Sequence, residues 1–517
     1  MKIISQDIKN QYECLREINN FVERNFGKKM KYIQPADRHQ YQLMSSLDDL
    51  VAKEHPVRII NQIVDAIVIN NRERFEKERE EEAGRPRYHD SIKLKLYLYG
   101  YFNGISSSRK LETETYRNIE VIWLLGGLKP DHWTISNYRK EKGEDIKFVT
   151  KKFREFLKEN GYIKLNTLAI DGSKIKAYTN REMLTKEKIE TKLESVDKKI
   201  EEYLSKIADN DRREDVMEEL GIEENEVGNG KYLEKIIRLQ KEVENLRKQK
   251  EKLEAEERKY ISASDPEARL MKSREGMIPA YNVQIAVDAE NKMIADSEVV
   301  TDENDQELLS VMIESIKEEL GDVPKEVIAD TGYDTPDLIE AIEKEEEGIS
   351  VYVSQRTTTR DKDEIKFEYN AEQDEYLCTE GKRLVLVQKN KLKKKSLTNV
   401  YQGIECEGCR LRGLCTKSKV GRMILRYKNQ QWRGEYKTKM LSKLGKEKMA
   451  IRKTIVEHPF GTIKYLMGKI PLLLRGLKKV TTEINLYVTV YNLKRLLNIE
   501  TYENLVMKIE NYRWEAV

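Results

Sequence analysis

The stretch Leu168-Ala169-Ile170-Asp171-Gly172-Ser173-Lys174 places one carboxylate directly after a short apolar run, next to residues that form turns. Such a run is typical of a buried strand, which would end at Asp171 and deliver this acid to the edge of a sheet. A second apolar run, residues 327–329, is followed in the same way by Asp330, by a turn and by a predicted helix. We therefore predict two buried strands that each end in an aspartate.

A third acid, Glu457, lies in the segment 454–461, and Lys464 follows it by seven positions. Three carboxylates from strands and a helix are what a two-metal phosphoryl-transfer site requires, because they can hold a pair of Mg²⁺ ions. An aspartate that ends a strand is often only a cap or turn former, but two such strands and a distant glutamate favour a metal site. Pro459 cannot donate a hydrogen bond inside a helix, so we expect a helix that starts there and leaves Glu457 at its N-terminus.

The composition indicates a multi-domain protein without membrane spans. The chain has 517 residues, of which 39% are hydrophobic, and this is too long for one ordinary core. It contains no apolar run long enough to cross a bilayer and no apolar core of a signal peptide near its start. Five cysteines, an odd number, do not suggest a disulfide framework. We expect a cytoplasmic protein with reduced thiols.

The positive charge is concentrated in one segment. Residues 381–480 hold 27 lysines and arginines against 5 acids, although the net charge of the whole chain is only +3. An ordinary solvated surface would have both signs interspersed. A basic segment beside clustered carboxylates is instead typical of a protein that binds a polyanion, most often nucleic acid.

Periodicity and composition divide the chain into five parts. The first is a helical N-terminal domain in which a helix-turn-helix could bind DNA ends, and the second is an α/β core that two insertions interrupt. The predicted boundaries are 1–158 for the helical domain, 159–355 and 445–475 for the core, 181–260 and 356–444 for the insertions, and 476–517 for a C-terminal helical segment.

The first insertion carries two heptad-spaced apolar seams that predict long helices. The simplest arrangement is an antiparallel helical hairpin, although an intermolecular coiled coil fits the pattern too; in either case we interpret it as scaffolding. The seams consist of Ile189, Leu193, Val196, Ile200, Tyr203 and Ile207, and of Ile236, Leu239, Val243, Leu246 and Leu253.

The second insertion is basic, and we predict that it is rich in strands. Four of its residues, Cys378, Cys406, Cys409 and Cys415, offer thiolates that would suit tetrahedral structural zinc, and the alternative is four buried free thiols. The lysines of one short run favour phosphate contact over mere protection of a sheet edge; the run is Lys389, Lys391, Lys393, Lys394 and Lys395. Trp432 is more simply a packing residue than a platform for an unpaired base.

The segments around the three acids resemble the catalytic blocks of DDE transposases from bacterial insertion sequences. The blocks are DGSKIKA at 171–177, ADTGY at 329–333 and VEHPFGTIK at 456–464. The similarity extends to DPEARLM at 265–271, YNVQ at 281–284 and YNLKR at 491–495, and it spans about residues 35–497.

This resemblance implies a ribonuclease-H-like α/β fold, a mixed sheet with flanking helices, in which Asp171, Asp330 and Glu457 bind two Mg²⁺ ions, with Mn²⁺ as a substitute. It also implies that water attacks the phosphodiester at each transposon end and that the freed 3′-hydroxyl then attacks target DNA. The implied partner is double-stranded DNA, bound at the ends by a homodimer, in a cytoplasmic, nucleoid-associated protein.

One block departs from the pattern of the family, in which tyrosine, arginine, glutamate and lysine recur at fixed spacing. Lys464 fits that pattern, but Lys453 stands at the arginine position and Ala450 at the tyrosine position. Arg452 is the candidate replacement for the arginine, and we predict that these basic residues contact DNA. Two other functions stay open: a catalytically silent DNA-binding descendant, and a metal-dependent nuclease without strand transfer.

Overall fold

The computed structural model divides the chain into two compact units, Met1–Asp49 and Leu50–Val517, and the elements considered below belong to the second. The structure describes residues 46–76, 87–180, 182–219, 229–273, 276–346, 348–355, 365–393, 396–468 and 471–515.

Helices fill the described part of the N-terminal region. Apolar residues recur along α2 with helical spacing and are buried, while polar residues alternate with them, as expected for an amphipathic helix. The helices are α2 (Pro56–Asn70), α3 (Arg72–Phe75), α4 (Asp90–Phe102), α5 (Ser108–Arg117), α6 (Ile119–Leu124), α7 (His132–Glu141) and α8 (Gly143–Glu159).

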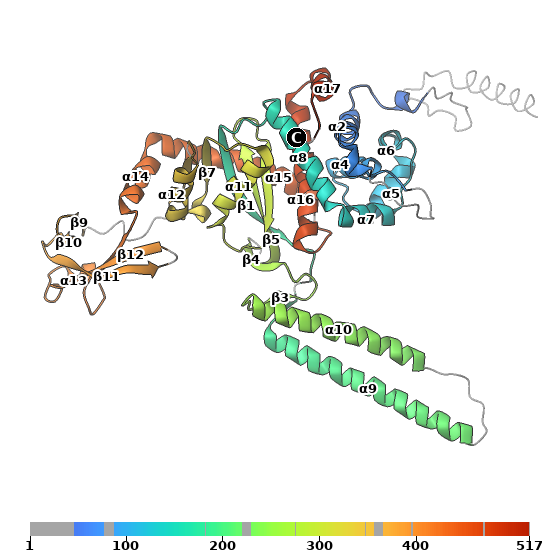
Figure 1. Ribbon diagram of the computed structural model, residues 1–517, viewed down its shortest axis with the longest axis horizontal. Helices are drawn as coiled ribbons and strands as arrows, with labels where there is room; N and C mark the ends of the chain where they lie inside the picture. The colour runs from blue at the N-terminus through green and yellow to red at the C-terminus, as the bar shows by residue number, and fades with distance from the viewer. Residues whose placement is uncertain are drawn as a thin grey trace, which may run out of the picture. The chain divides into compact units, whose positions relative to one another are not determined.

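A mixed sheet forms the centre of the second unit, and Figure 1 shows its strands β1, β5 and β7 side by side. The strand order is β6–β5–β1–β7–β8, and β4 also pairs with β5. β5 is antiparallel to β1, β4 and β6, whereas β1, β7 and β8 run parallel. This topology is compatible with a ribonuclease-H-like core. The strands are β1 (Thr167–Lys176), β4 (Arg269–Ser273), β5 (Gly276–Asp288), β6 (Ile294–Val300), β7 (Glu326–Ala329) and β8 (Ser350–Val353).

The first strand does not end at Asp171, so that expectation is wrong. β1 continues to Lys176 because it pairs with β5 along residues 168–176. Its other neighbour, β7, pairs with it only as far as Ile170. Asp171 therefore lies within β1, at the point where one of its two neighbouring strands ends.

Helices pack on this sheet. Helix α15 (Lys443–Met467) contacts β1, β5, β7 and β8, and α11 (Leu308–Leu320) contacts β6 and α8. Helix α16 (Leu477–Ile499) is buried nearly all round, between β6, α8 and α4, and it buries polar residues such as Glu483 and Asn492 together with its apolar ones. Helices α12 (Pro336–Glu345) and α17 (Tyr502–Asn511) complete this part. Among the described helices, none combines the length and the apolar character that a membrane span requires.

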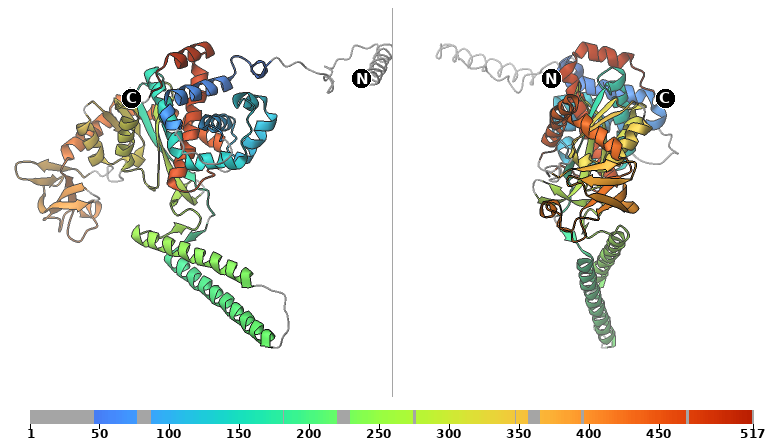
Figure 2. Two further views of the ribbon diagram at one scale, coloured as in Figure 1. Left: turned by 45° about the vertical axis from the view of Figure 1, so that its right-hand side comes forward. Right: turned by 90° about the vertical axis from the view of Figure 1, so that its left-hand side faces the viewer.

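Two long helices, α9 (Lys186–Glu219) and α10 (Asn229–Ala255), follow β1 in the chain and lie side by side in both views (Figures 1 and 2). They join the short strands β2 (Met183–Leu184) and β3 (Ile261–Ser262). Several predicted seam residues are buried, and ion pairs such as Lys250–Glu190, at 2.7 Å, link the helices. The buried seam residues are Ile189, Val196, Ile236, Val243, Leu246 and Leu253.

A second, five-stranded antiparallel sheet follows β8, in the order β13–β12–β11–β10–β9. Its fully buried apolar cluster contains only Tyr376, Leu384 and Tyr401. Helix α14 (Gln430–Leu441) then leads to α15, and its Trp432 stacks on Tyr436 with ring centroids 4.9 Å apart, in agreement with a packing role. The strands are β9 (Phe367–Asn370), β10 (Glu375–Cys378), β11 (Arg383–Lys393), β12 (Ser396–Gly403) and β13 (Met423–Tyr427), and a short helix, α13 (Arg412–Cys415), lies before β13.

A buried ion pair joins the N-terminal helices to α16. Arg139 Nη1 of α7 lies 3.4 Å from Glu483 Oε1, and it donates a hydrogen bond to the Tyr101 hydroxyl. Glu483 Oε2 accepts the backbone N–H groups of Leu473 and Leu474. Burial raises the pKa of Glu483, while Arg139 and the two N–H groups oppose that rise. The carboxylate therefore depends on Arg139 for its charge.

Replacement of Arg139 by leucine should lower the free energy of unfolding by about 3–5 kcal/mol, because it leaves a buried carboxylate without its cation. Urea denaturation of the full chain measures this change. The double variant Arg139→Leu with Glu483→Gln should recover part of the loss, and Arg109→Leu, at an exposed position of α5, serves as the control. A loss below about 1 kcal/mol for Arg139→Leu would contradict the assignment.

Candidate active site

Asp171 and Asp330 lie next to each other because β1 and β7 pair in parallel. Their register places Ile170 opposite Ala329, and the two aspartates are the next residues of the two segments. Neighbouring strands are about 4.8 Å apart. Asp330 caps the short helix η2 (Thr331–Tyr333). Its Oδ1 accepts a hydrogen bond from the backbone N–H of Gly332 at 2.6 Å. The structure thus brings together the two acids that the apolar runs predicted.

The carboxylate of Asp171 is partly buried beside charges of both signs. Burial raises its pKa to about 6; the cation of Arg452 opposes this rise, and Asp330 adds to it. Arg452 Nη1 lies 3.6 Å from Asp171 Oδ2 and makes no hydrogen bond within the described residues. The sequence predicted a DNA contact for Arg452, and its ion pair with Asp171 was not foreseen.

Glu457 lies inside α15, so the expectation that a helix starts at Pro459 is wrong. α15 runs from Lys443 to Met467 with Pro459 in its interior. A proline there costs a hydrogen bond, but the apolar side chains around it, including Ile455, Val456 and Phe460, are buried and hold the helix together.

The continuous helix aligns charged residues on one face. With about 3.6 residues per turn, Lys453, Glu457 and Lys464 lie within a narrow angular range. Glu457 and Lys464 are both exposed and face a groove of about 990 Å³. Lys464 also lies 5.7 Å from the ring centroid of Phe460.

Asp171 and Glu457 line this same groove, although Asp330 does not. Four lysines accompany them along its wall, so acids and bases share one open surface. The lysines are Lys174, Lys176, Lys272 and Lys464. Such a groove combines cations that can hold phosphates with oxygen ligands that can hold a metal ion.

A fourth carboxylate, Asp305, organises the polar groups behind the two aspartates. Its Oδ1 accepts hydrogen bonds from Lys174 Nζ at 3.0 Å, from Asn282 Nδ2 at 2.7 Å and from Gln284 Nε2 at 2.9 Å. The Tyr333 hydroxyl in turn donates to Gln284 Oε1. This cluster was missed at the level of sequence because Asp305 follows no strand, and only the polar residues within the apolar strand β5 hint at it.

Gly172 lets this cluster pack directly against β1. A Cβ atom at Gly172 would lie 2.3 Å from Gln284 Nε2 and 3.0 Å from Asn282 Oδ1. A larger residue would therefore displace the side chains that Asp305 holds. The glycine after Asp171 is required by close packing rather than by a turn.

The donor atoms at this site suit a hard divalent cation. Asp171 and Asp330 offer carboxylate oxygens, and Mg²⁺ commonly binds through one or two carboxylates together with waters and substrate phosphates. A cation bound between the two carboxylates would reduce their mutual repulsion and would offset the cost of partly burying the charge of Asp171. Among the described residues, however, no group of three or more histidine, cysteine, aspartate or glutamate side chains is arranged to hold a metal ion as it stands.

The other predicted basic contacts lie elsewhere. Lys389 and Lys391 are exposed on β11 in the second sheet, and Lys393 is the last residue of that strand. Lys394 and Lys395 lie outside the described residues. The predicted phosphate contact by this run stays a prediction.

The four clustered cysteines line one small cavity of about 30 Å³ in the second sheet. They are Cys378, Cys406, Cys409 and Cys415, and none of them forms a disulfide with a described residue.

Two family models match the chain. A model described as Transposase DDE domain matches residues 377–497, and one described as Transposase domain (DUF772) matches residues 45–141. Both families are transposases, which indicates an enzyme that acts on DNA in transposition. Together the two matches indicate, more narrowly, a DDE transposase of the insertion-sequence type. DDE transposase domains generally use divalent metal ions. No curated protein and no solved structure matches the chain.

The two family matches cover only part of the candidate active site. Glu457, Lys464 and the four cysteines lie within the DDE match, whereas Asp171 and Asp330 lie outside both matches. The roles of the two aspartates therefore rest on their position in the fold.

Replacement of Asp305 by alanine should lower the free energy of unfolding by about 1–3 kcal/mol, because it removes the acceptor that Lys174 and two buried amides, those of Asn282 and Gln284, share. Thermal or urea denaturation measures the loss. The matched control is Asp302→Ala, whose exposed carboxylate lies three residues earlier. Equal effects of the two substitutions would contradict the organising role of Asp305.

Proposed function

We propose that this chain cleaves DNA at the ends of an insertion sequence by metal-dependent phosphodiester hydrolysis and joins the freed 3′-hydroxyl to target DNA. One observation carries the proposal: the parallel pairing of β1 and β7 sets Asp171 beside Asp330, and Asp171 shares a lysine-lined groove with Glu457. The transposase family matches support the same reaction class.

In this proposal Asp171, Asp330 and Glu457 hold two Mg²⁺ ions, for which Mn²⁺ can substitute. When bound, the ions would activate the attacking oxygen and stabilise the leaving one. The carboxylates of the chain supply the negative charge that retains the ions. Arg452, 3.6 Å from Asp171, limits the repulsion between the acids before the metals bind.

The basic residues of the groove would position the DNA backbone. Lys176 and Lys272 make no ion pair with another described residue, so their charges are available to phosphates. Lys464 and Lys453 share a face of α15 with Glu457, so a phosphate that they bind lies close to the third acid. As point charges they attract phosphates without the two-pronged geometry of arginine.

Double-stranded DNA is the proposed substrate of both steps. The transposon end is cleaved in the first step, and the target DNA is joined to it in the second. Two ends must be brought together, so we propose that a homodimer forms on them. Within each chain the exposed lysines of β11 would add contacts to the DNA backbone.

Asp330→Ala should reduce Mg²⁺-dependent cleavage of a plasmid that carries the flanking ends of the gene by roughly 1000-fold, because metal-bound transition states are stabilised by several kcal/mol. Asp171→Asn and Glu457→Gln should cause losses of similar size. Gel analysis of nicked, cleaved and joined products measures both steps.

Asp302→Asn, in an exposed carboxylate outside the groove, is the control and should cleave normally. Cleavage without joined products would identify a nuclease without strand transfer. Folded protein that binds the ends but does not cleave them would instead identify a silent DNA-binding protein.

Lys464→Ala should weaken binding to DNA of any sequence and should reduce the slope of log affinity against log salt concentration by about 1, because one phosphate contact is lost. Fluorescence anisotropy at several salt concentrations measures the slope. The control is Lys443→Ala at the exposed start of the same helix, where the lysine faces Glu447. An unchanged slope for Lys464→Ala would place this residue outside the DNA path.

A further inference from the structure

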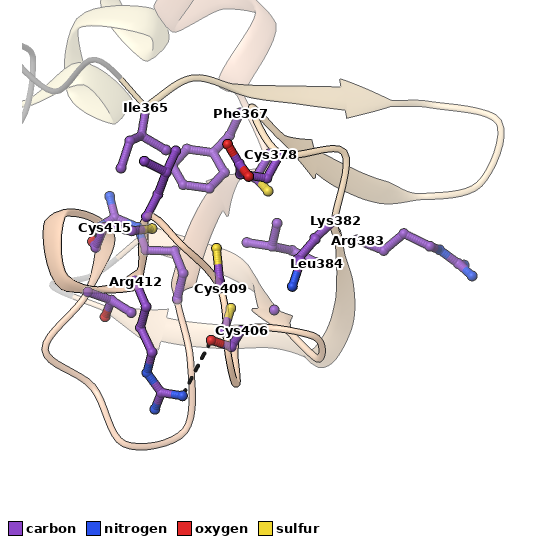
Figure 3. A pocket seen from close by; sticks show the side chains of 15 residues that line it. Ile365, Phe367, Cys378, Lys382, Arg383, Leu384, Cys406, Cys409, Arg412 and Cys415 are labelled. Atoms are coloured by element: carbon purple, nitrogen blue, oxygen red, sulfur yellow. Dashed lines mark hydrogen bonds between the residues drawn. The ribbon is translucent and has the colours of Figure 1, made fainter.

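The cavity in the second sheet is bounded by thiols from three separate parts of the chain. Cys378 ends β10, Cys406 and Cys409 follow β12, and Cys415 ends the short helix α13. Figure 3 shows the four sulfur-bearing side chains around one small space. At about 30 Å³ it has room for a single ion and is too small for an organic ligand. We call it the cysteine cavity.

The backbone around the cysteine cavity bends in ways that bring the thiols together. Gly408, between Cys406 and Cys409, has a φ of 72°, a left-handed conformation that lets the chain reverse within the C-x₂-C element. The Cys409 N–H donates to the Cys406 carbonyl across this turn at 3.4 Å. At Gly403 a Cβ atom would lie only 2.5 Å from Cys406 Sγ, so a glycine is needed for this sulfur to fit.

Cations surround the cysteine cavity and bind its backbone. Arg412 Nη1 donates to the Cys406 carbonyl at 3.3 Å, and Arg422 Nη1 donates to the Cys415 carbonyl at 2.8 Å. Lys382 also lines the cavity, as does one acid, Glu380, which pairs with Arg410 at 3.2 Å. These three cations, Arg412, Arg422 and Lys382, can offset negative charge in the cavity.

The sheet around the cysteine cavity has a small core. Among the described residues, three side chains of its apolar cluster are buried and five more are partly buried against them. Small domains with such a core commonly need a disulfide or a metal ion for stability. No disulfide occurs among the described cysteines.

We propose that Cys378, Cys406, Cys409 and Cys415 bind one structural Zn²⁺ ion in a tetrahedral site. Binding breaks four S–H bonds, forms four Zn–S bonds and releases four protons to solvent, and the resulting charge of −2 is offset by Arg412, Arg422 and Lys382. As the described side chains stand, no three of them are arranged to hold a metal. The cysteine side chains must therefore turn inward about their Cα–Cβ bonds when zinc binds.

Elemental analysis of the full chain, purified under reducing conditions from zinc-containing medium, should find one zinc per chain. The double variant Cys406→Ser with Cys409→Ser should lose nearly all of it. The matched control is Cys14→Ser, which changes the one cysteine of the sequence outside the cluster and should keep one zinc per chain.

A second measurement does not depend on whether the variant folds. Titration of the Cys14→Ser protein, which keeps the whole cluster, with a mercurial reagent should release one zinc for every four thiols that react, as followed with a zinc-binding dye. The same treatment should increase proteolysis within residues 365–427. Folded protein without zinc, with four freely reactive thiols, would overturn the proposal, and so would iron with acid-labile sulfide or a disulfide between cluster cysteines. None of these readouts requires DNA cleavage, so their failure is distinguishable from failure of the proposed function.

Discussion

The parallel pairing of β1 with β7 is the constraint on which the candidate active site depends. A strand register is strongly specified wherever a face of the strand is buried, because a slip of one residue would move every side chain to the opposite face. Leu168, Ala169 and Ile170 on β1 and Val327, Ile328 and Ala329 on β7 are all buried. Their burial holds the register, and the register holds Asp171 beside Asp330. The apolar residues that precede each acid thus determine where the acid lies.

Helix α15 relates the third acid to the sheet. It packs on β1, β5, β7 and β8, and its Glu457 and Lys464 line the groove. Because the helix runs unbroken through Pro459, Arg452 lies near Asp171 and Lys464 lies farther along the same groove. This one helix therefore supplies three groups of the site: Arg452 as the ion-pair partner of Asp171, Glu457 as the third acid, and Lys464 as a candidate phosphate contact.

The local sequence pattern predicted some features of the fold and the candidate site correctly, and it failed where contacts distant in the chain decide the structure. The apolar runs before Asp171 and Asp330 predicted buried strands, and the structure pairs these strands as β1 and β7. The end of β1 was misjudged because the partner that extends it, β5, lies about a hundred residues away in the chain. The start of α15 was misjudged at Pro459 because the local cost of a proline is outweighed by tertiary burial of its neighbours. The role of Asp305 follows from three donors on β1 and β5, a convergence that no spacing reveals.

The order of the elements along the chain has a consequence for how the protein folds. β1 must pair with a strand roughly 160 residues later, and α15 reaches the same sheet nearly 300 residues after β1. The entropy of closing such loops grows only slowly, by about 0.6 kcal/mol for each doubling of length, so the long intervening segments cost little stability. They do raise the contact order, and folding through distant contacts is slow. During synthesis the groove is completed only after helix α15 (Lys443–Met467) has left the ribosome.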